Sequence, residues 1–132
     1  MVTYLTFDEV RRAHHTMIEM IEGEQRACLH PGIYENSLSR CLERPRTIIH
    51  GFTPYPDLFS KAAALLDCLI GTNVFVDGSK RTGFLACDLF LERNGYYIDP
   101  NAPIKRFLLA VAQSDLDLQA IAQWLAAHSV RK

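Results

Sequence analysis

Two stretches rich in apolar residues, 58–70 and 79–94, constrain the fold of this 132-residue chain more than any other feature. In the first, apolar residues occupy two sides of a helix: Leu58, Phe59, Ala62, Ala63, Leu65, Leu66, Leu69 and Ile70. In the second, they cover most of the circumference: Phe84, Leu85, Cys87, Leu89, Phe90 and Leu91. Helices that are apolar on more than one side need neighbours to cover them. The pattern therefore predicts two buried central helices.

The rest of the chain predicts four amphipathic helices around these two. The first begins at Thr6 and Glu9, which fit a capping box. The second begins near Pro31 and is stopped by Pro45. Residues 45–56 hold three prolines and a glycine, so they form a connecting loop that is long enough to be functional.

Capping residues predict the bounds of the remaining helices. We expect Asp57 to cap the first apolar helix and Gly71 to end it. The second apolar helix should span residues 79–94. Asn101 is expected to cap a fifth helix, and residues 114–117 to open a sixth.

The fold class that follows is all-α: a compact bundle of about six helices in one domain, residues 1–132. Residues 96–98 form a short extended piece at best. With 48% hydrophobic residues, the chain can bury a substantial core.

Charge and hydropathy exclude two classes of function. A net charge of -1 argues against a general nucleic-acid binder. No apolar run reaches the roughly 20 residues that span a bilayer, and charges at residues 8–12 interrupt any signal segment. We therefore expect a cytoplasmic protein without nucleic-acid or membrane partners.

The four cysteines, at positions 28, 41, 68 and 87, contain no C-x-x-C pair, so no compact zinc site is indicated. Free thiols are expected, because a chain of this length can fold without disulfides. Cys68 and Cys87 lie in apolar runs and should act as small core residues.

The segment from residue 72 to residue 83, between the two apolar helices, carries the main functional signal. Ser79 can cap the second helix, which places Lys80 and Arg81 in its first turn. The helix dipole is positive there and disfavours each cation by roughly 0.3–1 kcal/mol. An anion held by free backbone N–H groups and by both side chains would explain the pair.

Asp77, just upstream, could hold a magnesium ion that bridges phosphates. The combined interpretation is a phosphate and Mg²⁺ site that works by positioning and charge. The alternative is that Lys80 and Arg81 are solvated surface cations and Asp77 is a turn residue. A Walker-type loop does not fit, because the residue five before Gly78 is Asn73.

This segment resembles the signature of the Fic/Doc family, which in its Doc branch reads His-x-Phe-x-[Asp/Asn]-[Gly/Ala]-Asn-Lys-Arg. The matching positions are Phe75, Asp77, Gly78, Lys80 and Arg81. Further stretches also resemble death-on-curing proteins: residues 4–6, 62–66, 90–96 and 117–125. The resemblance covers nearly the whole chain and implies a single Fic/Doc (Fido) domain over residues 1–132.

The resemblance also implies an activity. Fic proteins transfer AMP from ATP to protein hydroxyls, whereas Doc toxins transfer phosphate to a threonine of elongation factor Tu and are neutralised by an antitoxin. Lys80 and Phe84 stand where Fic proteins have a glycine and a second arginine, which points to the Doc branch. The implied cofactors are ATP and Mg²⁺, and the implied partners are a protein substrate and an antitoxin.

Site roles follow from the same resemblance. Asp77 would contribute to the Mg²⁺ and phosphate environment. Gly78, Ser79 and Lys80 would form the anion cradle, and Arg81 would bind phosphate. Asn73 stands at the position of the family's general base.

The chain departs from the family pattern at three positions, because Asn73, Val74 and Ser79 replace the usual His, Pro and Asn. An amide cannot accept a proton near neutral pH. Losing a positioned base typically costs about 10²–10⁴-fold in rate. Two hypotheses stay open: a Doc-like toxin whose activity is weakened or absent, and a pseudoenzyme that binds a nucleotide or a protein. His50, in the proline-rich loop, is the one histidine that could replace the base.

Overall fold

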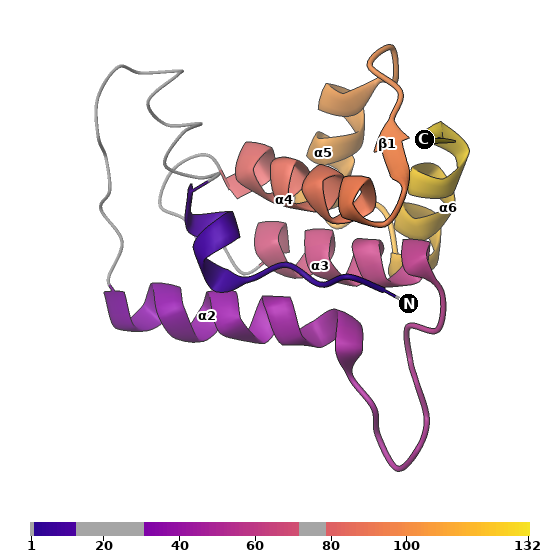
Figure 1. The fold of residues 1–132 in the computed structure, drawn as a ribbon. Helices are drawn as coiled ribbons and strands as arrows, with labels where there is room; N and C mark the ends of the chain where they lie inside the picture. Colours follow the sequence, from indigo (N-terminus) through magenta and orange to yellow (C-terminus); the bar gives the residue numbers. More distant parts are fainter. Residues whose placement is uncertain (1, 13–30, 72–78) are drawn as a thin grey trace.

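The computed structural model describes residues 2–12, 31–71 and 79–132 of the chain, except for the side chains of residues 31–36 and 79. Residues 7–12 are helical. The further elements, shown in Figure 1, are the helices α2 (Pro31–Glu43), η1 (Arg44–Arg46), α3 (Leu58–Gly71), α4 (Ser79–Arg93), α5 (Ile104–Ala112) and α6 (Leu118–His128), and the strands β1 (Tyr96–Ile98) and β2 (Ser129–Arg131). The expected all-α bundle is confirmed.

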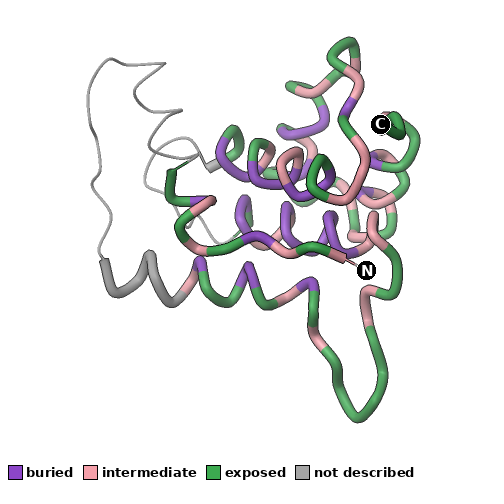
Figure 2. Tube along the Cα trace, viewed as in Figure 1, coloured by how far each residue is buried: buried purple, intermediate pink, exposed green. Residues whose placement is uncertain are grey.

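Helix α3 is the centre of the molecule. It packs against α2, η1, α4, α5 and α6, and Figure 2 shows its turns as largely buried. Ala62, Ala63, Leu66 and Leu69 have no exposed surface. Small and aliphatic residues on two sides of the helix allow neighbours to approach it from several directions, as the sequence predicts.

Helix α4 buries one stripe of its surface and exposes the rest. Ala86, Cys87, Phe90 and Leu91 are at most 1% exposed, and they recur at the three- and four-residue spacing of a helix face. Leu85, on another side, is 39% exposed. Of the two expected central helices, α3 therefore lies deeper in the bundle than α4.

Three helix starts follow the expected capping chemistry. The Thr6 N–H donates to the Glu9 carboxylate at 2.9 Å, and the Glu9 N–H donates back to the Thr6 hydroxyl at 3.3 Å. The Asp57 carboxylate accepts from the Ser60 N–H at 2.8 Å at the start of α3. Asp117 caps α6 in the same manner, also at 2.8 Å. These bonds satisfy N–H groups that have no partner within their helix.

The expected cap at Asn101 is wrong, because α5 begins at Ile104 with Pro103 before it. The Asn101 N–H donates to the Asp99 side chain at 2.9 Å, and the Ala102 N–H donates to the Asp99 carbonyl at 3.0 Å. Asp99 therefore organises a turn at these residues, as short acidic side chains often do, and the helix starts two residues later than the sequence suggests.

The C-terminal strand β2 is an element that the sequence pattern did not predict. It pairs antiparallel with β1, the short extended piece at residues 96–98, with Tyr97 opposite Val130. Three residues are too few to display a period of two, and their extended conformation depends on the partner strand.

The expectation of free thiols is wrong for two cysteines. Cys41 on α2 and Cys68 on α3 form a disulfide, with their Cα atoms 5.4 Å apart. Cys87 is free and fully buried in α4, as expected, and burial raises the pKa of its thiol. Cys28 lies outside the described residues. Cys41 and Cys68 come within bonding range because α2 packs against α3, a contact that cannot be seen in the sequence alone.

Candidate functional site

The start of α4 carries the part of the predicted phosphate site that the structure describes. Lys80 and Arg81 are exposed in its first turn, which contains no acidic residue. Thr82 follows with no exposed surface. Ser79 is the first described residue of the helix, and its role as a cap stays a prediction from the sequence. Two cations at the positive end of a helix, without an acid in that turn, form an arrangement that a bound anion would stabilise.

The remaining predicted site residues are Asn73, Asp77 and Gly78, and all three lie outside the described residues. Their assignment as base position, metal ligand and part of the anion cradle stays a prediction from the sequence. Among the residues that the structure does describe, no cluster of three His, Cys, Asp or Glu side chains could hold a metal ion.

A close contact between α3 and α4 fixes the first turn of α4. A Cβ atom added to Gly83 would lie 3.0 Å from Ile70 Cγ1 and 3.5 Å from Leu66 Cδ1. A side chain at Gly83 would force Ile70 to shift by a few tenths of an ångström, and glycine avoids this crowding. The end of α3 and the start of α4 lie at the same end of the molecule in Figure 1. Lys80 and Arg81 therefore lie close in sequence to a tight contact between α3 and α4.

A second cationic pair, Lys105 and Arg106, stands in the first turn of α5. Both side chains are exposed, and this turn also lacks an acidic residue. Charge at a helix start therefore does not distinguish the two pairs, and the specific signal for α4 comes from the motif around Lys80 and Arg81.

Asp88, in the middle of α4, has a carboxyl pKa above its usual value. Burial of the half-buried side chain raises its pKa, and the nearby charge of Glu92 adds to the increase, while a hydrogen bond from the backbone of Ile98 opposes it. The bond from Ile98 ties α4 to β1. Asp88 therefore supports the packing of α4 and does not belong to the charged first turn.

The loop between η1 and α3 projects as a hairpin (Figure 1). Ile49 and Phe52 pair across its turn, with N–H to carbonyl distances of 2.8 Å in both directions. His50 and Gly51 occupy the turn at positive φ, 49° and 80°. Ile48, Ile49 and Phe52 are 53–67% exposed. Figure 1 places this hairpin away from the end where α3 stops and α4 starts, so the structure gives no support to His50 as a replacement base.

Two polar side chains at the base of this hairpin, Lys61 and Arg44, make hydrogen bonds that were not predicted from the sequence. The ammonium of Lys61, which is 7% exposed, donates to the carbonyls of Pro45 at 3.2 Å and Tyr55 at 2.6 Å. Arg44 donates to the Tyr55 hydroxyl at 3.1 Å and to Asp67 at 3.2 Å. The advance signal was that Lys61 and Asp67 are the two charged residues in the largely apolar stretch of residues 58–70.

These contacts also affect the titration of Arg44. Burial by itself lowers the pKa of the guanidinium group, but the bonds and charge interactions with Tyr55 and Asp67 outweigh it and raise the pKa. Arg44 is therefore a permanent cation that ties η1 to the middle of α3.

No helix among residues 2–12, 31–71 and 79–132 has the length and apolar character to cross a bilayer.

Comparison with known proteins identifies relatives of this chain. The model of the Fic/DOC family matches residues 4–91, which is more than half of the chain and includes the start of α4. Toxin Doc of Mycolicibacterium smegmatis (strain ATCC 700084 / mc(2)155) is 38% identical over 92 residues, covering 67% of this chain and 71% of that protein. The similarity thus extends well beyond the motif.

Proposed function

Because the chain belongs to the Fic/Doc family, we propose that it is a Doc-like toxin of a toxin–antitoxin pair, acting in the cytoplasm. The proposed reaction transfers phosphate from ATP, with Mg²⁺, to a hydroxyl of a protein, by resemblance a threonine of elongation factor Tu. The observation that carries the proposal is the match to the family model, which includes the exposed Lys80–Arg81 pair at the start of α4.

The residues of this site fit a phosphate chain. Lys80 and Arg81 offer ammonium and guanidinium donors on the exposed side of the first turn of α4. Arg can bind phosphate oxygens in a bidentate manner, and Lys adds a point charge. ATP would supply the transferred group, and Asp77 would hold the Mg²⁺. The contact between Gly83 and Ile70 keeps the two cations in place.

Asn73 sets the expected rate. In the proposed reaction it orients the acceptor hydroxyl through its amide but cannot take its proton. We expect a rate about 10²–10⁴-fold below that of a protein with histidine at this position.

The first test uses the protein and its Asn73→His variant, each incubated with elongation factor Tu and with ATP labelled at the α or the γ phosphate. Label transfer from the γ phosphate by the variant, and slower transfer by the unchanged protein, would support the proposal. Transfer from the α phosphate would indicate the AMP transfer of Fic proteins and would contradict it.

The second test measures ATP affinity in variants of the cationic pair. Lys80→Ala and Arg81→Ala should each weaken binding several-fold, because each removes a phosphate contact. The matched controls are Lys105→Ala and Arg106→Ala, which remove an equivalent exposed pair from the first turn of α5. Equal losses at both helices would mean that the nucleotide is attracted by charge alone, against a site at α4.

Asn73 also favours a second candidate, a pseudoenzyme that keeps the fold and binds a nucleotide or a protein without turnover. In both cases an antitoxin is the expected partner, since Doc is the toxin of such a pair. Transfer of γ-label by the unchanged protein would defeat this second candidate. ATP binding without transfer, with transfer restored by Asn73→His, would support it.

A further inference from the structure

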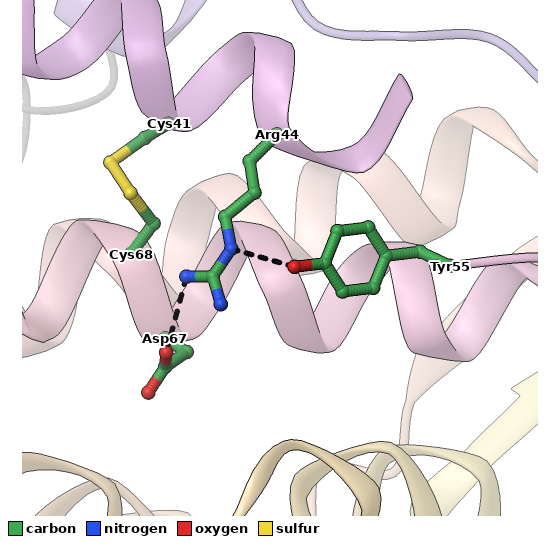
Figure 3. The surroundings of a disulfide bond; sticks show 5 residues. All are labelled: Cys41, Arg44, Tyr55, Asp67 and Cys68. Carbon is green, nitrogen blue, oxygen red and sulfur yellow. Dashed lines mark hydrogen bonds and ion pairs between the residues drawn. A yellow bond between two sulfur atoms is a disulfide. The ribbon is translucent and has the colours of Figure 1, made fainter. Parts of the chain in front are cut away.

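The disulfide between Cys41 and Cys68 joins α2 to α3 (Figure 3). Its two sulfur-bearing residues differ in exposure. Cys41 has no exposed surface, whereas Cys68 is partly exposed. Of the two cysteines, Cys68 is therefore the one that a thiol from solution can approach.

A surface pocket provides this approach. It has a volume of about 460 Å³ and is lined by Ser39, Arg40, Glu43, Arg44, Thr47 and Cys68. Cys41 is not among its lining residues. The volume is sufficient for a molecule larger than water, such as a small thiol.

Counted over the described residues alone, the charges around the pocket carry an excess of one positive unit. Arg44 is paired with Asp67, and Arg46 is paired with Glu43 at 4.0 Å. Arg40 is exposed on α2 and adds a third guanidinium group. A cationic surrounding favours the thiolate form of a sulfur and attracts anionic reagents.

We propose that Cys68 is a site of thiol–disulfide exchange, at which small anionic thiols open and close the bond between α2 and α3 through this pocket. A thiolate attacks Cys68 Sγ, forms a mixed disulfide with it, and displaces Cys41, whose sulfur leaves as a thiolate and takes up a proton. A second thiol then attacks the mixed disulfide and releases the Cys68 thiol. Two reagent thiols are oxidised to one disulfide, and the protein disulfide is reduced to two thiols. The reverse reaction uses the oxidised reagent.

The difference in exposure between the two cysteines also sets the expected rate of thiol–disulfide exchange. Because Cys41 leaves into a buried environment, where a thiolate is poorly solvated, exchange in the folded protein should be slower than in the unfolded chain. The bond should nevertheless exchange without unfolding, since Cys68 lines an open pocket.

The first experiment establishes the bond. The full protein is oxidised with glutathione disulfide, alkylated, and digested with trypsin without reduction. We expect a linked pair of peptides, residues 41–46 and 62–80, because the Arg44–Pro45 bond resists trypsin. The pair should disappear after reduction. Cys41 and Cys68 both recovered as alkylated thiols would overturn the proposal.

The second experiment tests the route through the pocket. Exchange rates at pH 7 and low salt are measured by mass spectrometry with 3-mercaptopropionate, an anionic thiol, and cysteamine, a cationic one. Arg40→Gln should slow the reaction with 3-mercaptopropionate about threefold, the effect of one charge at a few ångströms in water. It should leave the reaction with cysteamine unchanged or slightly faster.

The matched control is Arg106→Gln, which removes an exposed arginine from α5, outside the pocket. It should leave both rates unchanged, and in guanidinium chloride all three proteins should react alike. Equal effects of Arg40→Gln on the two thiols would overturn the route. So would exchange that occurs only at the rate of global unfolding. None of these readouts depends on ATP or on toxin activity, so the proposed function can fail without affecting this result.

Discussion

Several polar side chains of this protein have ended up inside an otherwise apolar bundle, and each affects stability in its own way. Asp88 is half-buried on α4 and loses part of its hydration, which raises the pKa of its carboxyl group. Lys61 is almost fully buried on α3 and keeps two carbonyl partners. We expect the Asp88 carboxylate to lower the stability of the fold when it is charged, and the Lys61 ammonium to raise that stability through its two hydrogen bonds.

Replacing Asp88 should change how stability depends on pH. Below pH 3.8, the usual pKa of this carboxyl group, Asp88 is protonated in both the folded and the unfolded chain. As the pH rises through its raised pKa, the folded state must accept a poorly solvated carboxylate, so stability is lost. Asp88→Asn stays neutral and can still accept the bond from Ile98. Its free energy of unfolding relative to the unchanged protein should therefore rise between pH 3.5 and pH 7. A constant or falling difference in denaturant titrations would contradict this explanation.

Replacing Lys61 should weaken the base of the hairpin. Lys61→Met keeps the length of the side chain but leaves the carbonyls of Pro45 and Tyr55 without their donor. We expect a loss of roughly 1–3 kcal/mol in the free energy of unfolding, together with faster amide exchange over residues 47–57. Lys105→Met, at an exposed position, should stay within about 0.5 kcal/mol. A stable Lys61→Met variant would mean that the cost of burying the charge outweighs its bonds.

Among the helices, how closely α3 and α4 can pack depends on where glycine leaves out a side chain. Helices α3 and α4 approach closely at Gly83, where an added Cβ would meet Ile70 Cγ1 at 3.0 Å. At Gly71, at the end of α3, no atom of the described residues lies within 4 Å of the corresponding position. Among the described residues, the two glycines therefore differ in their surroundings.

Substitution of these glycines separates packing from backbone effects. Gly83→Val should destabilise the protein by about 1–3 kcal/mol, because its branched side chain enters an occupied space. Gly71→Val, the matched control, meets open space and should cost less. Thermal unfolding of both variants measures the difference. If the two transitions shift equally, the close approach of α3 and α4 is not what requires Gly83.

Element boundaries illustrate how far local sequence can be used for prediction. The caps at Thr6, Asp57 and Asp117 were predictable, because the bond that each makes reaches only three residues along the chain. The Asn101 cap was wrong, since Asp99 draws Asn101 into a turn and the Ile104 N–H, which such a cap would bind, donates to the Ala102 carbonyl at 2.8 Å. Strand β2 had no local signal, because its pairing partner β1 lies some thirty residues earlier in the chain.

For the whole molecule, the disulfide is the largest single constraint that we expect on stability. It closes a loop with a sequence separation of 27 residues, which restricts the unfolded chain. The loop-entropy relation then gives a contribution of about 3.5 kcal/mol at 25 °C. Guanidinium titrations with and without dithiothreitol should show this loss on reduction.

A variant that cannot form the bond supplies the control for this measurement. The double variant Cys41→Ala, Cys68→Ala should be insensitive to dithiothreitol and should resemble or fall below the reduced protein. Its buried alanine at position 41 also leaves a small cavity. If the unchanged protein unfolds at the same denaturant concentration with and without reductant, the bond does not stabilise the fold.

What the sequence by itself determined were the properties carried by near neighbours: the helical class, three caps, the apolar centre at α3, and the motif that identified the Fic/Doc family. Helix periodicity and motifs extend over a few residues, so they are visible in one dimension. The pairing of Cys41 with Cys68, the burial of Lys61 between two distant carbonyls, and the contact of Gly83 with Ile70 were decided by the tertiary structure alone. In each case the partners belong to different elements, and only the packing of those elements brings them together.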